Sequence, residues 1–170
     1  MRLILSDLPL QIDMKEKTDV HVVDLSSLKI TNCVGCFGCW VKTPGKCVIR
    51  DDATKVYPLI AKSDSVIYVS HIRYGGYDTI MKTMLERAIP IQKAFIRLHH
   101  GETHHVQREV VEKDAVIIAY GVRSKEEQEL FTRLVKRNAE NMLFRSYQIR
   151  FVSQEQVQQA VNEEVSKWEN

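Results

Sequence analysis

The chain has 170 residues, 44% hydrophobic and 27% charged, a composition typical of a water-soluble domain that buries its own core. Its 24 basic and 22 acidic side chains leave a net charge of +2, so electrostatics give no case for binding nucleic acid or an anionic membrane. No stretch approaches the roughly 18 consecutive apolar residues of a membrane-spanning helix. We therefore expect a single domain over residues 1–170, with no nucleic-acid or membrane partner.

Strand-like runs and helical periods alternate along the chain. The strands are expected at Arg2–Ser6, Val20–Asp24, Ser65–Ser70, Ala115–Tyr120 and Ser146–Val152. The helices are expected at Asp51–Ser63, Tyr77–Ile89, Ser124–Met142 and Ser153–Trp168, and Pro58 weakens the case for the first of them. The last two helices each begin with a capping-box pattern, Ser124 with Glu127 and Ser153 with Gln156.

This alternation predicts a three-layer α/β fold whose parallel sheet is covered by helices on both faces. The third and fourth strand runs are almost wholly apolar, as interior strands are, whereas the second and fifth alternate, as edge strands do. We therefore predict a doubly wound, five-stranded sheet in the order 2-1-3-4-5. Ligands of such sheets bind beyond the carboxyl ends of the strands, so the segments after Ser6, Ser70 and Tyr120 are the candidates for chemistry.

All four cysteines fall between Cys33 and Cys47, too close together to tie distant segments through disulfides. The first three cysteines, Cys33, Cys36 and Cys39, recur at every third position. Cys47 follows after seven further residues that include a Pro-Gly turn. A compact Cys-x2-Cys-x2-Cys run with a further cysteine is typical of iron–sulfur ligation. Zinc more often takes two separated pairs, and thiol exchange or simple packing are the other interpretations. Clustered thiols and an N-terminus without a charged leader predict a cytoplasmic protein.

The cysteine run followed by Asp51-Asp52, with Ser63-Asp64-Ser65 and Tyr74-Gly75-Gly76-Tyr77 farther along, resembles the NADPH-dependent FMN reductase and iron–sulfur flavoprotein group of flavodoxin-like proteins. The resemblance covers roughly residues 1–125. It implies a flavodoxin-like fold, FMN at the rim of the sheet, electrons drawn from NAD(P)H, and usually a homodimer. In the iron–sulfur branch of the group, the four cysteines hold a [4Fe–4S] cluster; the matching residues here are Cys33, Cys36, Cys39 and Cys47.

The resemblance also implies where a flavin ring would lie. The segment after the third strand would line it through backbone amides and aromatic contact, with Ser70, Ile72, Tyr74, Gly75 and Gly76 as the residues. Arg73 would neutralise a phosphate or a reduced flavin, or is simply a solvated loop cation. Gly121 and Val122 would form a further flavin loop after the fourth strand.

Two features depart from that family. Relatives place a loop rich in Ser, Thr, Gly and Asn, followed by a full helix, after the first strand, where backbone N–H groups hold the FMN phosphate. Here residues 7–19 contain no glycine and leave room only for a shortened first crossover, and Asp7 would repel a phosphate. We therefore expect the usual phosphate site to be missing. In addition, relatives commonly have a proline directly after the third strand and a tyrosine two residues later. This chain has His71 and Arg73 at those positions, and its tyrosine, Tyr74, comes one position later.

Two polar groups outside these segments are also notable. Four histidines gather around Glu102 and are candidates for metal ligands, for substrate or partner contacts, or for ordinary surface residues: His99, His100, His104 and His105. The segment that carries them is expected to be an excursion between a helix and the fourth strand. Lys82, Glu86 and Arg87 have the spacing of an ion-pair set on a helix.

These observations support three hypotheses. The first, which we favour, is an FMN-dependent NAD(P)H oxidoreductase that passes electrons to a small-molecule acceptor, with no side chain assigned as a catalytic acid or base. The second is an electron-transfer protein with a [4Fe–4S] cluster on the four cysteines. The third is a non-enzymatic flavodoxin-like scaffold that has lost the phosphate site and binds a partner or another ligand.

Overall fold

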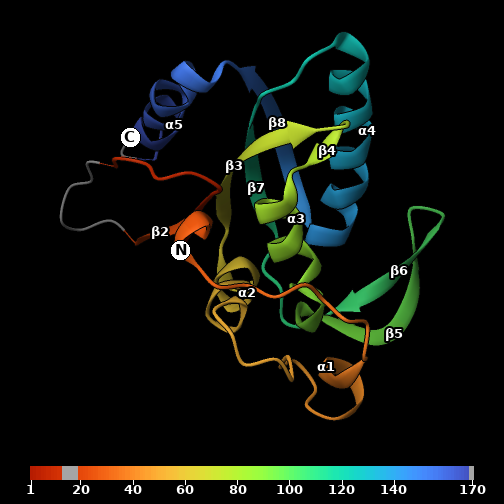
Figure 1. Ribbon diagram of the computed structural model, residues 1–170. Coiled ribbons are helices and arrows are strands. Elements are labelled where there is room, and N and C mark those ends of the chain that lie inside the picture. The colour runs from red at the N-terminus through yellow and green to blue at the C-terminus, as the bar shows by residue number, and fades with distance from the viewer. Residues whose placement is uncertain (13–18, 169–170) are drawn as a thin grey trace.

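The computed structural model describes residues 1–12 and 19–168, and its centre is a mainly parallel sheet (Figure 1). The strands lie in the order β2-β1-β3-β7-β8, which confirms the predicted order 2-1-3-4-5. Their bounds are Val20–Asp24 for β2, Arg2–Ser6 for β1, Ser65–Arg73 for β3, Lys113–Tyr120 for β7 and Phe144–Val152 for β8. All four pairings between these neighbours are parallel.

Helices cover both faces of the sheet, as predicted. Alternate residues of β3 point to opposite faces, so Tyr68 joins one core and Ile67 joins the other. The Tyr68 face packs against α2 (Ala53–Lys62), α3 (Thr79–Glu86) and α4 (Lys125–Met142). The Ile67 face packs against α5 (Val157–Ser166). Within the described ranges, no helix is long and apolar enough to cross a membrane.

The first crossover leads from β1 to β2 through residues 7–19. The described part, residues 7–12, contains no helix, and Leu8, Leu10 and Ile12 pack directly against the core beside α5. The rest of this predicted short connection, residues 13–18, lies outside the described residues. Three apolar side chains thus help to cover the α5 face of the sheet where a helix was expected to be missing.

The predicted helix Tyr77–Ile89 is wrong at both ends. The chain leaves β3 at Arg73 and folds back as β4 (Gly76–Tyr77), which pairs antiparallel with the end of β3. The helix starts only after Asp78, whose carboxylate accepts a hydrogen bond from the Thr79 amide. It ends before a 3-10 turn, η2 (Ile89–Ile91). The other three predicted helices are present with small shifts at their ends, and α2 continues through Pro58.

A β-hairpin between α3 and β7 was not predicted. It consists of β5 (Gln92–His99) and β6 (Glu102–Gln107) and stands beside the main sheet (Figure 1). Its turn is His100-Gly101, and both residues have positive φ angles, 49° and 79°, as the two-residue turns of β-hairpins often do. The signal for this hairpin in the sequence is therefore the His-Gly pair between two β-prone runs.

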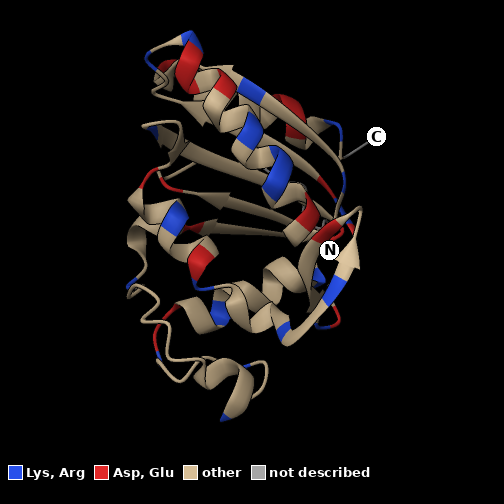
Figure 2. Ribbon diagram, turned by 90° about the vertical axis from the view of Figure 1, so that its right-hand side faces the viewer, with Lys and Arg blue, Asp and Glu red and all other residues tan. Residues whose placement is uncertain are grey.

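The cysteines lie on a loop at one end of the molecule, which contains the single-turn helix α1 (Gly38–Val41). Figure 2 shows few charged residues around this segment, whereas α4 carries both signs along its length. The loop is joined to the hairpin through Trp40. Its Nε1 donates a hydrogen bond to the carbonyl oxygen of Gln92 (3.0 Å), and its ring centroid lies 4.7 Å from that of His105.

Candidate functional site

The four cysteines line one small cavity, although the end of α1 and a turn separate Cys47 from the other three along the chain. The cavity has a volume of about 60 Å³, its walls are almost wholly apolar, and all four thiols are free. Gly35 and Phe37 both adopt left-handed backbone conformations, which bends the loop tightly enough to bring the first three cysteines together. The other wall residues are Val34, Trp40, Ile49 and Ile89.

The sulfur atoms of the loop can be compared with the ligand spacing of a closed zinc site. Tetrahedral zinc, with Zn–S bonds of about 2.3 Å, holds its sulfur ligands about 3.8 Å apart. Among residues 1–12 and 19–168, no three cysteines have sulfur atoms that all lie within 4.8 Å of one another. The four cysteines nevertheless line one shared space, as the ligands of an iron–sulfur cluster do.

A buried arginine lies beneath the cysteine loop. Arg87 is only 1% exposed, and its guanidinium donates to both carboxylate oxygens of Asp51 (2.6 and 2.8 Å). The same group donates to the Thr31 carbonyl oxygen (2.6 Å) and lies 3.4 Å from the sulfur of Cys47. Burial acts to raise the pKa of Asp51, but the hydrogen bonds from Arg87 and the Thr31 amide outweigh it and lower that pKa.

Arg87 therefore does not belong to a helix-surface ion-pair set, and that prediction is wrong. Lys82 and Glu86 do approach each other, at 3.9 Å, but Arg87 points the other way, into the protein.

The ionisation of Cys39 is also affected by its surroundings. Burial, and next the charge of Cys47, raise the pKa of the Cys39 thiol. A raised pKa keeps this thiol protonated and lowers its reactivity as a nucleophile.

The carboxyl ends of β1, β3 and β7 meet at a buried carboxylate. Asp7 follows β1, and one of its oxygens accepts hydrogen bonds from the Ser70 hydroxyl (3.1 Å) and the His71 amide (2.6 Å). Its other oxygen accepts from the Tyr120 hydroxyl (2.8 Å). Burial raises the pKa of Asp7, although these three hydrogen bonds act to lower it. The donors at the switch point of the sheet are thus already satisfied by an internal anion.

The imidazole of His71 fills the neighbouring space on the rim. Its Nδ1 lies 3.1 Å from the Asp78 carboxylate, and its ring packs edge-on against Tyr120. A Cβ atom added to Gly121 would lie 2.2 Å from His71 Nε2, so only glycine allows this approach. Asp7 and His71 together occupy the part of the rim between the ends of β1, β3 and β7.

The structure brings only some of the predicted flavin residues together. Ser70 and Ile72 are fully buried, Gly121 is covered by His71, and Val122 packs against the core. Gly75 faces the side chain of Leu130. The remaining three, Arg73, Tyr74 and Gly76, line one cleft.

That cleft, which we call the α3–α4 cleft, has a volume of about 620 Å³. The side chains of Tyr77, Leu85 and Leu134 form its apolar wall, and Asp78, Thr79, Lys82, Glu86 and Asn138 add polar groups. The exposed ring of Tyr74 stands at its mouth, with the Arg73 guanidinium carbon 5.3 Å from the ring centroid. The cleft begins at the carboxyl end of β3, where ligands of such sheets are expected.

An inner cavity of about 280 Å³ adjoins the cleft and was not predicted. The two share Tyr77, Leu85 and Asn138 as wall residues, and the inner cavity extends to His105 beneath the hairpin. Tyr68 also lines it, and the hydroxyl of this residue is buried and has no hydrogen-bond partner among the described residues. A tyrosine within an apolar strand gives no sign in the sequence that it lines a cavity.

The predicted histidines stay together in part, since the rings of His99 and His104 meet edge-on with centroids 5.8 Å apart, but their polar partners differ. His99 and His100 meet the carboxylate of Glu140 on α4. His104 lies against Asn141 and Glu102, and His105 lies against the Lys93 carbonyl and the ring of Trp40. Glu140 was missed because it lies some forty positions farther along the chain.

Comparison with known proteins confirms the resemblance to iron–sulfur flavoproteins. The chain is 40% identical over 72 residues to an iron–sulfur flavoprotein of Archaeoglobus fulgidus, which is 42% of this chain and 32% of that protein. It is 27% identical over 81 residues to iron–sulfur flavoprotein MJ1083 of Methanocaldococcus jannaschii, which is 48% of this chain and 41% of that protein. The match thus spans less than half of either relative. No protein-family model matches the chain.

Solved structures confirm the flavodoxin-like fold. An NAD(P)H:quinone oxidoreductase from Methanothermobacter marburgensis superposes with a TM-score of 0.55 at 12% identity, covering 98% of this chain and 94% of that one. An FMN-dependent NADH-azoreductase from Bacillus anthracis superposes with a TM-score of 0.53 at 11% identity, covering 87% and 78%. At these identities, the likeness is evidence for the fold.

Proposed function

We propose that this chain is a flavin-linked oxidoreductase that uses FMN, takes electrons from NAD(P)H and delivers them to a small-molecule acceptor in the cytoplasm. The observation that carries the proposal is the α3–α4 cleft, because Arg73, Tyr74 and Gly76 line it at the carboxyl end of β3. The similarity to iron–sulfur flavoproteins and the flavodoxin-like fold support the same assignment.

The cleft residues suit a flat aromatic ligand. The exposed ring of Tyr74 offers a stacking surface, and Tyr77, Leu85 and Leu134 provide an apolar wall. Gly76 has no side chain to keep a planar ring from the backbone. A bound FMN exchanges electrons between a two-electron donor such as NAD(P)H and one- or two-electron acceptors. The side chains named here orient that ring and exclude water from one of its faces.

The phosphate of FMN does not fit the usual position after β1. Asp7 already takes the Ser70, His71 and Tyr120 donors there, and its negative charge opposes a second anion. Arg73 is the cation of the α3–α4 cleft that is available to pair with a phosphate instead, whereas Lys82 lies 3.9 Å from the Glu86 carboxylate. We therefore assign the ring to the cleft and assign no role in phosphate binding to the β1 end.

Flavin titrations of the full chain test this assignment. FMN and riboflavin are added separately, and binding is followed by quenching of flavin fluorescence. Tyr74→Ala is expected to weaken both ligands, and Arg73→Ala to weaken FMN about tenfold while leaving riboflavin nearly unchanged. Arg133→Ala, an exposed arginine of α4 outside the cleft, is the matched control. A protein that is colourless as isolated and quenches neither flavin overturns the proposal and favours a non-enzymatic scaffold.

A second candidate function is electron transfer through a [4Fe–4S] cluster. It is favoured by one observation, the convergence of Cys33, Cys36, Cys39 and Cys47 on a single apolar cavity. Anaerobic purification or reconstitution with iron and sulfide is expected to produce a broad brown absorption near the flavin bands. Cys47→Ser is expected to abolish or weaken it, and Ser26→Ala, a surface serine on η1 (Leu25–Ser27), to leave it unchanged. Equal iron content in Cys47→Ser and wild type argues against four-cysteine ligation.

A further inference from the structure

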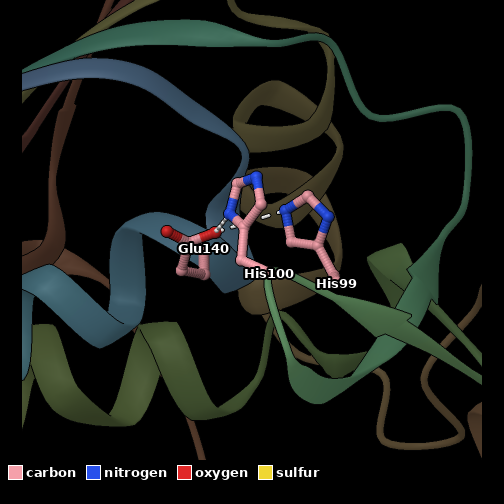
Figure 3. A group of neighbouring side chains, drawn as sticks. All are labelled: His99, His100 and Glu140. Carbon is pink, nitrogen blue, oxygen red and sulfur yellow. Dashed lines mark hydrogen bonds and ion pairs between the residues drawn. The ribbon is translucent and has the colours of Figure 1, made fainter.

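The tip of the hairpin meets the end of α4 through three potential metal ligands. Figure 3 shows the rings of His99 and His100, from the hairpin, beside the carboxylate of Glu140, from α4. His99 Nε2 lies 3.2 Å and His100 Nδ1 lies 3.0 Å from the same carboxylate oxygen, Oε2. Within the part of the chain that the structure describes, this is the one group of three or more such side chains whose ligand atoms all lie within 4.8 Å of one another.

These distances are those of hydrogen bonds and lie slightly below the edges of a coordination polyhedron. Zinc binds imidazole nitrogen and carboxylate oxygen at about 2.0–2.2 Å, which places ligands of a tetrahedral site about 3.3–3.5 Å apart. The two nitrogen–oxygen separations of 3.0 and 3.2 Å fall just short of that range. A small outward movement of the side chains is therefore enough to admit an ion. Two imidazoles with one carboxylate form a known three-ligand zinc set that leaves further positions open.

The turn of the hairpin places two consecutive histidines on the same side. In an extended strand, neighbouring residues point to opposite faces. Here the left-handed conformation of His100, followed by Gly101, reverses the chain, and the two imidazoles stack with centroids 4.0 Å apart. Glu140 is held opposite them on the regular helix α4. The arrangement therefore depends on backbone geometry and not on a chance meeting of three mobile side chains.

Neighbouring charged groups leave this position free for a cation. His104 and Arg137 both pair with Glu102, so neither competes for Glu140. The three ligands open onto a cleft of about 530 Å³, and Glu112 on its wall adds a second carboxylate. Arg145, also on the wall, is paired with Asp114. A bound ion would thus have access to water or a small anionic ligand from the cleft.

We propose that His99, His100 and Glu140 form a binding site for one divalent transition-metal ion of the zinc class, separate from the cysteine loop and independent of the proposed flavin chemistry. The ion fastens the hairpin tip to α4. Its remaining coordination positions face the cleft that Glu112 and Tyr147 help to line.

Cobalt titration of the full chain tests this proposal, because Co²⁺ reports the chemistry of its ligands. Cysteine-bound Co²⁺ shows strong sulfur-to-metal absorption in the near ultraviolet, whereas a histidine–carboxylate site shows only weak visible bands. Wild type is expected to bind one Co²⁺ ion that shows only the weak visible bands of a histidine–carboxylate site, and Glu140→Gln is expected to lack that ion. Zn²⁺ affinity at this site, measured by calorimetry, is expected to fall at least about tenfold in Glu140→Gln and in His100→Ala.

Two controls keep the result specific. Glu126→Gln changes an exposed carboxylate in the first turn of the same helix, and His21→Ala changes an exposed histidine of β2; both are expected to bind as wild type does. Nitrogen NMR of the imidazoles gives a second readout, in which Zn²⁺ shifts the signals of His99 and His100 but not that of His21. The proposal is overturned if Glu140→Gln and wild type bind the same number of ions equally well, or if every cobalt band is of the thiolate kind.

Discussion

Asp7 illustrates how one residue can give a measurable pH dependence. Its pKa is raised above the ordinary value of 3.8, so the folded protein holds this proton to higher pH than the unfolded chain does. By linkage, the contribution of Asp7 to the free energy of unfolding falls as pH rises above that value. Asp7→Asn is expected to be more stable than wild type near neutral pH, with the advantage shrinking as pH falls toward 3.8.

Urea unfolding from about pH 4 to about pH 8 measures this difference. Asp114→Asn is a control in which the change in stability with pH should have the opposite sign. The reason is that hydrogen bonds from Arg145 and Ser146 lower the pKa of Asp114. That variant should lose stability at neutral pH and approach wild type in acid. A difference between Asp7→Asn and wild type that does not vary with pH contradicts the assignment of a raised pKa.

Among the residues near the cysteines, Arg87 is the one whose replacement should lower the free energy of unfolding most. Arg87→Met leaves Asp51 in place without the guanidinium that binds both of its oxygens, and about 3–5 kcal/mol of unfolding free energy should be lost. The double variant Arg87→Met/Asp51→Asn should lose less than the sum of the single losses. Lys82→Met on the exposed face of α3 should change stability by no more than about 0.5 kcal/mol. Additive losses would refute a buried pair.

At the scale of elements, Trp40 is the link between the cysteine loop and the hairpin. Trp40→Ala removes the hydrogen bond to the Gln92 carbonyl and the ring contact with His105. Local opening of the hairpin should then become easier, because two of its contacts with the rest of the chain are lost. Hydrogen exchange should accelerate at the amides of β5 and β6 and remain near wild type in β7. Equal acceleration in β7 would indicate global destabilisation instead.

The elements also show what sequence reasoning can and cannot reach. Strand order was predictable because β3 and β7 are apolar on both faces, and α4 was predictable from its Ser124 cap. The hairpin was missed because its strands expose apolar residues, contrary to the usual alternation, and its turn signal is only two residues long. The pairs Arg87–Asp51 and His100–Glu140 join residues 36 and 40 positions apart, and no local pattern encodes such contacts.

The candidate site was predictable only in part, for a physical reason. Spacing along the chain identified the cysteines, since ligands of one group must lie close together, and they do line one cavity. The flavin residues were implied by the family resemblance, but their burial depends on which side chains fill the rim. The sequence predicts that Asp7 repels a phosphate, and the structure adds that Asp7 accepts hydrogen bonds from Ser70, His71 and Tyr120.

At the scale of the whole molecule, the expected homodimer remains a prediction, and the hairpin is the place to test it. Phe95, Ile96 and Leu98 are 74%, 66% and 78% exposed on an element that stands beside the main sheet (Figure 1). Three exposed apolar side chains on one strand favour contact with a second copy. Phe95→Asp should shift the mass measured by light scattering toward the monomer. Leu130→Asp on α4 should not, and a wild-type monomer at all concentrations contradicts the expectation.

The buried carboxylate of Asp7 has a consequence for the affinity of phosphate-bearing ligands. It is tethered beside the donors that it satisfies, so its local concentration does not fall on dilution, whereas that of a free ligand does. A phosphate can reach the Ser70 hydroxyl and the His71 amide only in molecules whose Asp7 has rotated away. The apparent dissociation constant is then the intrinsic constant divided by the fraction of such molecules. The chain thus contains its own competitive ligand, and replacing this single side chain is the direct way to expose an anion site.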